Sequence, residues 1–548
     1  MRHSPPSRRL ELLALVLLFA VVVAAVNPRG EFPLDDDWDF AFDTWTWAET
    51  GKFQFTPFTA ATLRAQIVWG AAWSKVFGRS FEVLRASTLC LSLATTLLFN
   101  VFLASLRVPF KPRALMTLSL LFHPIFFWAS FTYMTHVPFV FLSLVSLCLF
   151  HTAITRRSDW FSVLGATAVV LSFLVRQVGV ANAIPPILAL IHLRRELGVR
   201  SARLALPPIL AIMIFVALFA FTSVLVPSAE EHKVHRKTVE WTTQSVLRNF
   251  VMMPSLNTAF NFMTGALLFL PVATAAALSR RSWTRRWVLL SASLVALFLI
   301  PATTMIRVRN AFPYRNGGNV FANLGLGPQT LRDTFHLGYL YPPAHLGNPA
   351  RAALTLLAAV LGAGLVVLLI RSASERHVER DRLAVILASY SAFSGAFILC
   401  FMKFFMDRYS LDALWSLPIL GALVVDWSQR RTRWTAAIAV AVVAIFSVTA
   451  TQEYLAWNRA RWDAYRFLRK GGVTLEQMDG GYEINAFLAL KTGRKDLGKR
   501  GFAVMDDRYL ITFNLLPGYR PLAGFPYPRL FGARKGYVFA LERSDPAR

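Results

Sequence analysis

Charged residues are scarce in this sequence of 548 residues, and most of those present are basic. They make up 16% of the chain, whereas a soluble domain has about 25%. Hydrophobic residues account for 55%, and the mean hydropathy is +0.46. This composition excludes an ordinary soluble domain and predicts a polytopic membrane protein.

Cysteine is also rare, and each of the three cysteines, Cys90, Cys148 and Cys400, lies inside an apolar run. They offer neither a disulfide framework nor the spacing of a metal site, so we interpret them as small hydrophobic residues. Phosphate-binding glycine loops, the H-E-x-x-H zinc motif and the nucleophile elbow of serine hydrolases are missing too. Nucleotide hydrolysis and serine chemistry therefore lack support.

The formal net charge of +27 would indicate a nucleic-acid partner in a soluble chain. Here Lys and Arg fall in short clusters between apolar runs, as the orientation signals of membrane proteins do. No basic face is continuous enough to follow a phosphate backbone. We therefore expect a membrane and no nucleic acid as the partner of these charges.

Apolar segments close to the ~20 residues needed to cross a bilayer recur along the whole chain. They are Leu10–Val26, Val83–Leu106, Ala114–Ser130, His136–Ile154, Trp160–Val175, Val178–Leu193, Leu204–Val226, Leu256–Leu278, Trp287–Ile306, Ala352–Ile370, Leu383–Phe401, Leu411–Val425 and Trp434–Thr451. We expect an all-α bundle of about thirteen transmembrane helices.

The first apolar segment follows Arg8 and Arg9, as the hydrophobic region of a signal peptide would. It is long for a signal peptide and no clear cleavage site follows, so we interpret it as an uncleaved helix with a cytoplasmic start. Alternation from there gives inner loops that are short and basic, such as the one with Arg430 and Arg431. The long polar segments and the C-terminal tail then lie on the extracytoplasmic side of the inner (plasma) membrane.

Three polar segments differ in their patterns. The first outer loop, residues 27–82, alternates aromatic and polar residues and predicts amphipathic helices on the membrane face. The outer loop at residues 307–351 is rich in Gly, Asn and Pro, and we expect it to be irregular. The tail, residues 452–548, combines a helical pattern with strand-like runs and predicts a small α/β domain behind a transmembrane domain of residues 1–451.

An acidic cluster opens the first outer loop, in FPLDDDWDFAFDTWTWAETGKF at residues 32–53. Asp35, Asp36 and Asp37 are consecutive, so they cannot all ionise cheaply, and at least one should have a raised pKa. Three interpretations remain open from the spacing. The cluster is a solvated loop, an active site that meets a lipid-borne substrate beside Trp38, or a site for a divalent metal ion.

The same stretch resembles a known signature. Residues 36–41, DDWDFA, and residues 48–53, AETGKF, resemble the first-loop motif of C-type (GT-C) membrane glycosyltransferases, in the branch of protein mannosyltransferases and the lipid A aminoarabinose transferase. Gln66, Gly70 and the pair Leu84-Arg85 also resemble these enzymes. The resemblance covers about the first 200 residues well, and beyond them chiefly the expected topology.

The resemblance implies a GT-C fold and transfer of a sugar, with inversion, from a polyprenyl-phosphate donor to a lipid, glycan or protein acceptor on the outer face. It implies that Asp36 is the catalytic base or positions the acceptor, with Asp37 as its acidic neighbour. A donor that is not a nucleotide sugar agrees with the missing nucleotide motifs. No cofactor is implied with certainty, and a divalent metal stays open.

A second family motif, a short outer loop that often contains T-D-x-P, corresponds here to Met134-Thr135-His136-Val137-Pro138. A histidine replaces the acid. His136 either accepts or relays a proton near neutral pH or is simply an interfacial polar residue.

Basic residues at the predicted outer ends of helices are candidates for holding a lipid-linked phosphate, since a guanidinium matches a phosphate in shape and charge. These candidates for substrate binding are Arg176 with Gln177, and Lys403, Arg408 and Tyr409 in KFFMDRYSLD. Arg307, Arg309 and Arg315 are weaker candidates. For each residue alone, the alternative is an interfacial anchor or a local ion pair, such as one between Asp407 and Arg408.

A transporter or flippase of lipid-linked saccharides is the rival hypothesis, because the same acids and arginines would line a path. Transporters commonly repeat their halves and place charges near the membrane midplane. This sequence keeps its charges at the predicted outer ends of helices and shows no evident repeat. A scaffold or receptor with the tail as its binding module is a third hypothesis, with little motif support.

Overall fold

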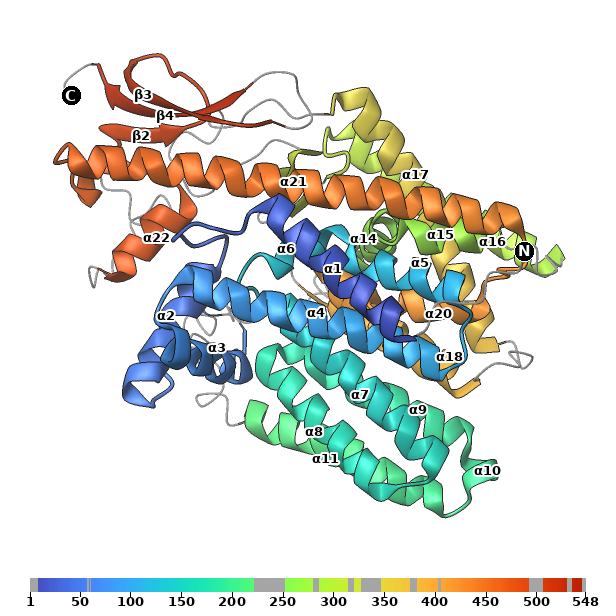
Figure 1. Cartoon of the computed structure of the whole chain (residues 1–548). Coiled ribbons are helices and arrows are strands. Elements are labelled where there is room, and N and C mark those ends of the chain that lie inside the picture. Colours follow the sequence, from blue (N-terminus) through green and yellow to red (C-terminus); the bar gives the residue numbers. More distant parts are fainter. Residues whose placement is uncertain are drawn as a thin grey trace, which may run out of the picture.

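The structure is a computed structural model that describes residues 8–56, 59, 61–220, 252–278, 285–313, 320–326, 346–374, 382–402, 406–491, 506–529 and 535–544. These ranges form a mainly helical bundle with a small β-sheet at one end (Figure 1). The predicted classes of secondary structure, a helical membrane part and a mixed tail, are both present.

Within the described ranges, eight helices are long and apolar enough to cross a membrane. They are α1 (Arg8–Val26), α4 (Phe81–Ser105), α7 (His136–Arg156), α11 (Arg200–Ala220), α16 (Arg285–Arg307), α17 (Asn348–Ser374), α18 (Arg382–Cys400) and α21 (Arg430–Lys470). A ninth span is formed if α14 (Met253–Leu268) and α15 (Leu270–Leu278), which are bent by 90° at their junction, are taken together.

The other four predicted spans are short or broken helices. They correspond to α5 (Phe110–Leu121) with α6 (Pro124–Ser130), to α8 (Asp159–Val175), to η1 (Gln177–Ala183) with α9 (Ile184–His192), and to α19 (Tyr409–Leu414) with α20 (Leu417–Val424). Prolines explain several breaks, because Pro124, Pro185 and Pro418 each stand in the first turn of a new helix. The structure thus does not confirm thirteen full-length spans.

Two helices occupy the first predicted outer loop, α2 (Asp37–Thr50) and α3 (Arg64–Phe77), and they pack against each other. Helix α2 ends at Gly51, which adopts the left-handed conformation and donates its backbone N–H to the Trp47 carbonyl. Helix α3 buries Gln66 and Ile67 on one side and exposes Val76 and Phe77 on the other. Exposed apolar residues on α3 suit a helix that lies at a membrane surface.

The last long helix, α21, has 41 residues and is therefore about 60 Å long, twice the thickness of a bilayer's hydrocarbon core. It runs without interruption through residue 451, where the sequence predicts a domain boundary. Strands β3 (Tyr519–Tyr527) and β4 (Gly536–Arg543) pack against it (Figure 1). One helix thus connects the bundle to the C-terminal sheet.

The sheet has four strands in the order β1-β2-β4-β3. Strand β1 (Met478–Asp479) pairs in parallel with β2 (Tyr509–Thr512), and β2 and β3 each pair antiparallel with β4. The predicted strand-like run GYVFALE is β4. Helix α22 (Tyr482–Lys491) directly follows β1, and the short turn η4 (Leu475–Gln477) precedes it.

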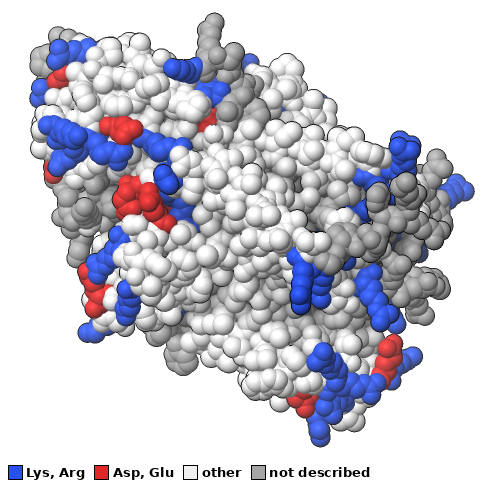
Figure 2. Space-filling view, in the orientation of Figure 1, with Lys and Arg blue, Asp and Glu red and all other residues white. Residues whose placement is uncertain are grey.

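The N-terminus, α10 (Arg194–Leu197) and the start of α21 lie at one end of the bundle, whereas α2, α3 and α22 lie at the other (Figure 1). Charged side chains gather at both ends of this face, with a broad band of uncharged residues between them (Figure 2). Lys and Arg dominate the end that carries α10 (Figure 2). This arrangement agrees with a multi-pass membrane protein.

Candidate active site

The acidic cluster lies where the chain enters α2, and its three carboxylates differ in exposure. Asp36 stands at the N-cap position of α2, and 21% of its side-chain surface is exposed, against 7% for Asp35. Asp37, in the first turn, is only 2% exposed. Asp36 is therefore the member of the triplet that a substrate can reach, in agreement with its choice from the sequence motif.

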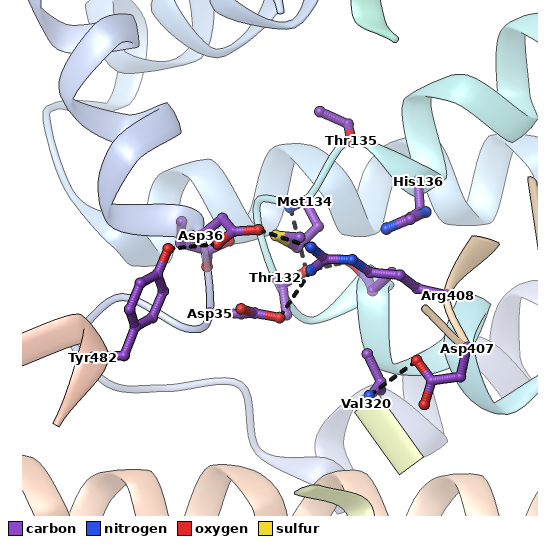
Figure 3. Close-up of polar contacts among 12 residues, drawn as sticks. Asp35, Asp36, Thr132, Met134, Thr135, His136, Val320, Asp407, Arg408 and Tyr482 are labelled. Carbon is purple, nitrogen blue, oxygen red and sulfur yellow. Dashed lines mark hydrogen bonds and ion pairs between the residues drawn. The ribbon is translucent and has the colours of Figure 1, made fainter. Parts of the chain in front are cut away.

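Arg408 bridges two of these acids. Its Nη1 lies 3.1 Å from Asp35 Oδ2, and its Nη2 lies 3.2 Å from Asp36 Oδ2 (Figure 3). The arginine precedes α19 and is 372 positions away from Asp36 in the sequence. The fold thus brings the predicted base and one predicted phosphate ligand into direct contact.

The second oxygen of the Asp36 carboxylate faces the C-terminal segment. The hydroxyl of Tyr482, the first residue of α22, donates to Asp36 Oδ1 at 2.8 Å (Figure 3). The backbone N–H of Asp35 donates to Glu483 Oε1 at 3.1 Å. Three elements, the start of α2, the start of α19 and the start of α22, therefore meet at Asp36.

Asp37 has a different task. Its Oδ1 accepts a hydrogen bond of 2.8 Å from the backbone N–H of Tyr133. Burial raises the pKa of Asp37 well above its usual value, and the neighbouring Asp35 and Asp36 add to this, although Arg85 and the Tyr133 N–H act in the opposite direction. The expectation of a raised pKa within the triplet is met at Asp37, which is buried and holds the segment before α7.

A second acidic pair lies one and two turns further along α2. Asp39 and Asp43 are buried and share the hydroxyl of Thr59, which lies 3.0 Å from Asp39 and 2.9 Å from Asp43. Thr56 also donates its hydroxyl to Asp39. Burial raises the pKa of Asp39 to about 7 and that of Asp43 well above its usual value.

A buried ion cluster adjoins the start of α7. His136 Nδ1 lies 3.0 Å from Asp412 Oδ1, and both side chains are fully buried. The guanidinium of Arg176 lies 3.3 Å from Asp412 Oδ2, 3.0 Å from His136 Nδ1, and donates to Thr135 Oγ1 at 3.0 Å. The ring of Tyr409 faces this guanidinium at 5.7 Å. A carboxylate from α19 thus stands beside the histidine that replaces the acid of the family motif.

The two groups form one site. Arg408 precedes Tyr409 in the chain, and it interacts electrostatically with His136. Asp407, on its other side, accepts the backbone N–H groups of Val320 and Phe321 at 3.0 and 2.8 Å and so fixes the turn before η3 (Ala322–Leu326). Burial raises the pKa of Asp407 to about 6, despite these two hydrogen bonds. Asp407 therefore anchors the second predicted outer loop beside the site.

The remaining predicted residues are placed as follows. Trp38 is fully buried and packs its edge against Tyr482 at 5.7 Å, so it supports the site from within the core. Gln177 is half-buried and follows Arg176 at the start of η1. Lys403 and Arg315 lie outside the described residues, and Arg307 and Arg309 are exposed beyond or at the end of α16.

Sequence reasoning missed Asp412 and Tyr482. Asp412 lies in the apolar segment Leu411–Val425, and an ionisable residue in a predicted span is itself a signal of function. Tyr482 carries no local signal, since its role comes from a contact across 446 positions. Within the described ranges, no group of three His, Cys, Asp or Glu side chains is arranged to hold a metal ion.

A comparison with solved structures finds three similar chains. AglB, the archaeal oligosaccharyltransferase from Archaeoglobus fulgidus in complex with an inhibitory peptide and a dolichol-phosphate, matches with a TM-score of 0.40 and 15% identity over 84% of this chain and 58% of that chain. ArnT from Cupriavidus metallidurans bound to undecaprenyl phosphate matches with a TM-score of 0.37 and 13% identity over 97% and 98%. The arabinosyltransferase EmbB from Mycobacterium smegmatis matches with a TM-score of 0.36 and 15% identity over 96% and 46%.

The chain thus spans 58% of the length of AglB and nearly all of ArnT. A scan against protein-family models and a search of curated proteins each find no match.

Proposed function

We propose that this protein is a GT-C glycosyltransferase that moves a sugar from a polyprenyl-phosphate donor to an acceptor on the extracytoplasmic face of the inner membrane. The observation that carries the proposal is the contact between Asp36 and Arg408. It joins an accessible carboxylate, at the position of the catalytic acid in the first-loop motif, to a cation suited to a phosphate.

In the proposed step, the Asp36 carboxylate takes the proton of the acceptor hydroxyl while the acceptor oxygen attacks the anomeric carbon. The new carbon–oxygen bond forms as the bond from that carbon to the phosphate oxygen breaks. The electron pair of the broken bond stays on the polyprenyl phosphate. A single displacement of this kind inverts the anomeric configuration, and the proton ends on Asp36.

The cations would act on the leaving group. Arg408 and Arg176 stand on neighbouring elements, and negative charge grows on the phosphate as the bond breaks. Arg408 is bound to Asp35 and Asp36, so the donor phosphate has to compete with these carboxylates. That competition would weaken the hold of Arg408 on Asp36 when the donor binds, which leaves Asp36 a better proton acceptor.

Asp37 and His136 would have supporting roles. Asp37 is buried and bound to the Tyr133 backbone, so it fixes the segment that leads to His136. His136 in turn contacts Arg176 and Asp412, which orients the guanidinium. The acceptor, a lipid, a glycan or a protein, is left open by this geometry.

The test uses the full chain in proteoliposomes with undecaprenyl-phosphate-linked mannose, glucose or arabinose and an envelope extract as acceptor. The readout is labelled product together with released undecaprenyl phosphate. Asp36→Asn should lower turnover by about 10²–10⁴-fold, the usual contribution of a general base. Glu49→Gln is the matched control, because Glu49 ends the same helix and pairs with Arg79 at the surface.

Full activity of Asp36→Asn would remove the base assignment. Net movement of the lipid-linked saccharide without covalent product would replace the transferase with the rival flippase. Runs with EDTA and with added Mg²⁺ or Mn²⁺ decide whether transfer needs a divalent ion.

A further inference from the structure

The C-terminal segment reaches the candidate base through the first two residues of α22. Tyr482 donates its hydroxyl to Asp36 Oδ1 at 2.8 Å, and Glu483 accepts the Asp35 backbone N–H at 3.1 Å. The two contacts hold both the side chain of Asp36 and the backbone just before it. They span the sequence from the first outer loop to the tail, which the resemblance to known enzymes does not cover.

The start of α22 is itself firmly held. Arg461 of α21, which is fully buried, lies 2.6 Å from Glu483 Oε2 and donates to the Gly480 carbonyl from Nε at 2.9 Å and Nη2 at 2.7 Å. Asp479 accepts the Gly481 N–H at 3.2 Å and the Asn485 side-chain amide at 2.9 Å. The position of the Tyr482 hydroxyl is therefore set by α21 and by the turn after β1.

Packing alone does not account for this tyrosine. Its ring meets Trp38 edge-on and belongs to a small apolar cluster with Ala486, a contact that a phenylalanine would also make. The hydroxyl adds a polar contact to the one carboxylate of the triplet that substrate can reach. A structural tyrosine and a positioning tyrosine therefore differ by one oxygen atom.

We propose that Tyr482 is a positioning residue for glycosyl transfer, and that the C-terminal segment is in this way an integral part of the active site. The inference rests on the proposed function of Asp36. With Tyr482 on one oxygen and Arg408 on the other, the Asp36 carboxylate is fixed in rotation. When Arg408 turns to the donor phosphate, the tyrosine keeps the carboxylate in place, so that Oδ2 faces the acceptor hydroxyl.

The hydroxyl also favours the ionised carboxylate, because a donor stabilises the charged acceptor more than the neutral one. Its removal should thus move the acid limb of the pH–rate profile to higher pH. One charge-assisted hydrogen bond corresponds to a shift of about 0.5–1 pH unit and to a loss in kcat of about tenfold.

The experiment compares wild type, Tyr482→Phe, Asp36→Asn and the double variant in the proteoliposome assay with the undecaprenyl-phosphate-linked sugar that the wild type uses. Tyr482→Phe should lower kcat about tenfold, leave the donor KM within about twofold, and shift the acid limb upward. In the Asp36→Asn background the same change should have no further effect, because the tyrosine acts through that carboxylate.

Two further variants sharpen the result. Tyr509→Phe is the matched control, since Tyr509 also donates its hydroxyl to a carboxylate, Glu542 at 3.0 Å, but within the sheet. A fluorotyrosine at position 482 keeps the shape and is a stronger donor, so it should move the acid limb to lower pH, and it covers the case in which Tyr482→Phe folds poorly.

The outcomes separate the two proposals. If the wild type transfers no sugar from any donor, the proposed function fails. If the wild type is active and Tyr482→Phe matches it in kcat and pH profile, only the role of Tyr482 is overturned. A fall in rate with an unmoved acid limb, or an equal fall in the Asp36→Asn background, assigns Tyr482 to packing and also overturns the inference.

Discussion

Asp412 and His136 lie 276 positions apart in the sequence and meet at 3.0 Å with both side chains fully buried. Arg176 closes the cluster from a third segment. Such a group is costly to bury unless its members satisfy one another, so each of them constrains where the others point. The carboxylate missing from the short loop before α7 is thus supplied by α19.

Removal of the Asp412 charge should release Arg176. Asp412→Asn leaves a partly buried guanidinium without its ion pair, and we expect a loss of about 2–3 kcal/mol in unfolding free energy. Binding of undecaprenyl phosphate, measured by titration calorimetry in detergent, should weaken several-fold. Asp463→Asn is the control, because its ion pair with Arg466 is half-exposed and should contribute under about 1 kcal/mol. Equal effects of the two variants would contradict this role.

The geometry of Arg408 should matter as well as its charge. A lysine at this position keeps the charge but cannot reach Asp35 and Asp36 with two separate nitrogens, as the guanidinium does. Arg408→Lys should therefore raise the donor KM by about tenfold or more in the transfer assay. Arg431→Lys, at an exposed position in the first turn of α21, should leave it unchanged. A donor KM that is insensitive to Arg408→Lys would show that the fork is not used.

Asp39 should govern part of the dependence of stability on pH. Burial raises its pKa from 3.8 to about 7, so the folded protein keeps a proton that the unfolded chain releases between these values. Since the folded state binds more protons in this window, stability falls as pH rises through it. An asparagine does not titrate, so the Tm of Asp39→Asn relative to wild type should increase from about pH 5 to about pH 8.

Thermal unfolding followed by tryptophan fluorescence in detergent measures this difference. Glu49→Gln, at an exposed site on the same helix, should give a constant offset. A constant offset for Asp39→Asn as well would mean that Asp39 is ionised throughout the window.

Asp407 should control the segment before η3. Its two oxygens accept the N–H groups of Val320 and Phe321 separately, and an asparagine would turn a donor toward one of them. In Asp407→Asn, hydrogen exchange at these two amides should become faster by about tenfold or more. Asp426→Asn, which removes an acid at the start of the turn before α21, should not affect them. Unchanged exchange in Asp407→Asn would refute the anchoring role.

Much of the frame follows from sequence because it depends on local chemistry. Apolar length predicts helices such as α4 and α7, and the motif after the first span identifies Asp36 as the exposed acid of its triplet. The short broken helices escape this reasoning, since Pro124 or Pro418 interrupts a run that hydropathy reads as continuous. A hydropathy window measures composition and carries no information about where a helix stops.

The partners of the site residues could not be predicted, because they depend on long-range packing. Nothing near Arg408 in the sequence distinguishes a pair with Asp407 from a pair with Asp36, yet the structure gives Asp407 to a backbone turn and Arg408 to the acidic cluster. The contact of Tyr482 is of the same kind. Such contacts arise only when α2, α19 and α22 are brought to the same end of the bundle.

The unbroken course of α21 links the register of one helix to the chemistry at its far end. Each residue added to a helix turns everything beyond it by about 100° and advances it by about 1.5 Å. A single insertion near residue 450 would swing Arg461, and with it Tyr482, away from Asp36. The length of α21 is thus fixed in phase, and only changes by near-integral turns keep the tail facing the base.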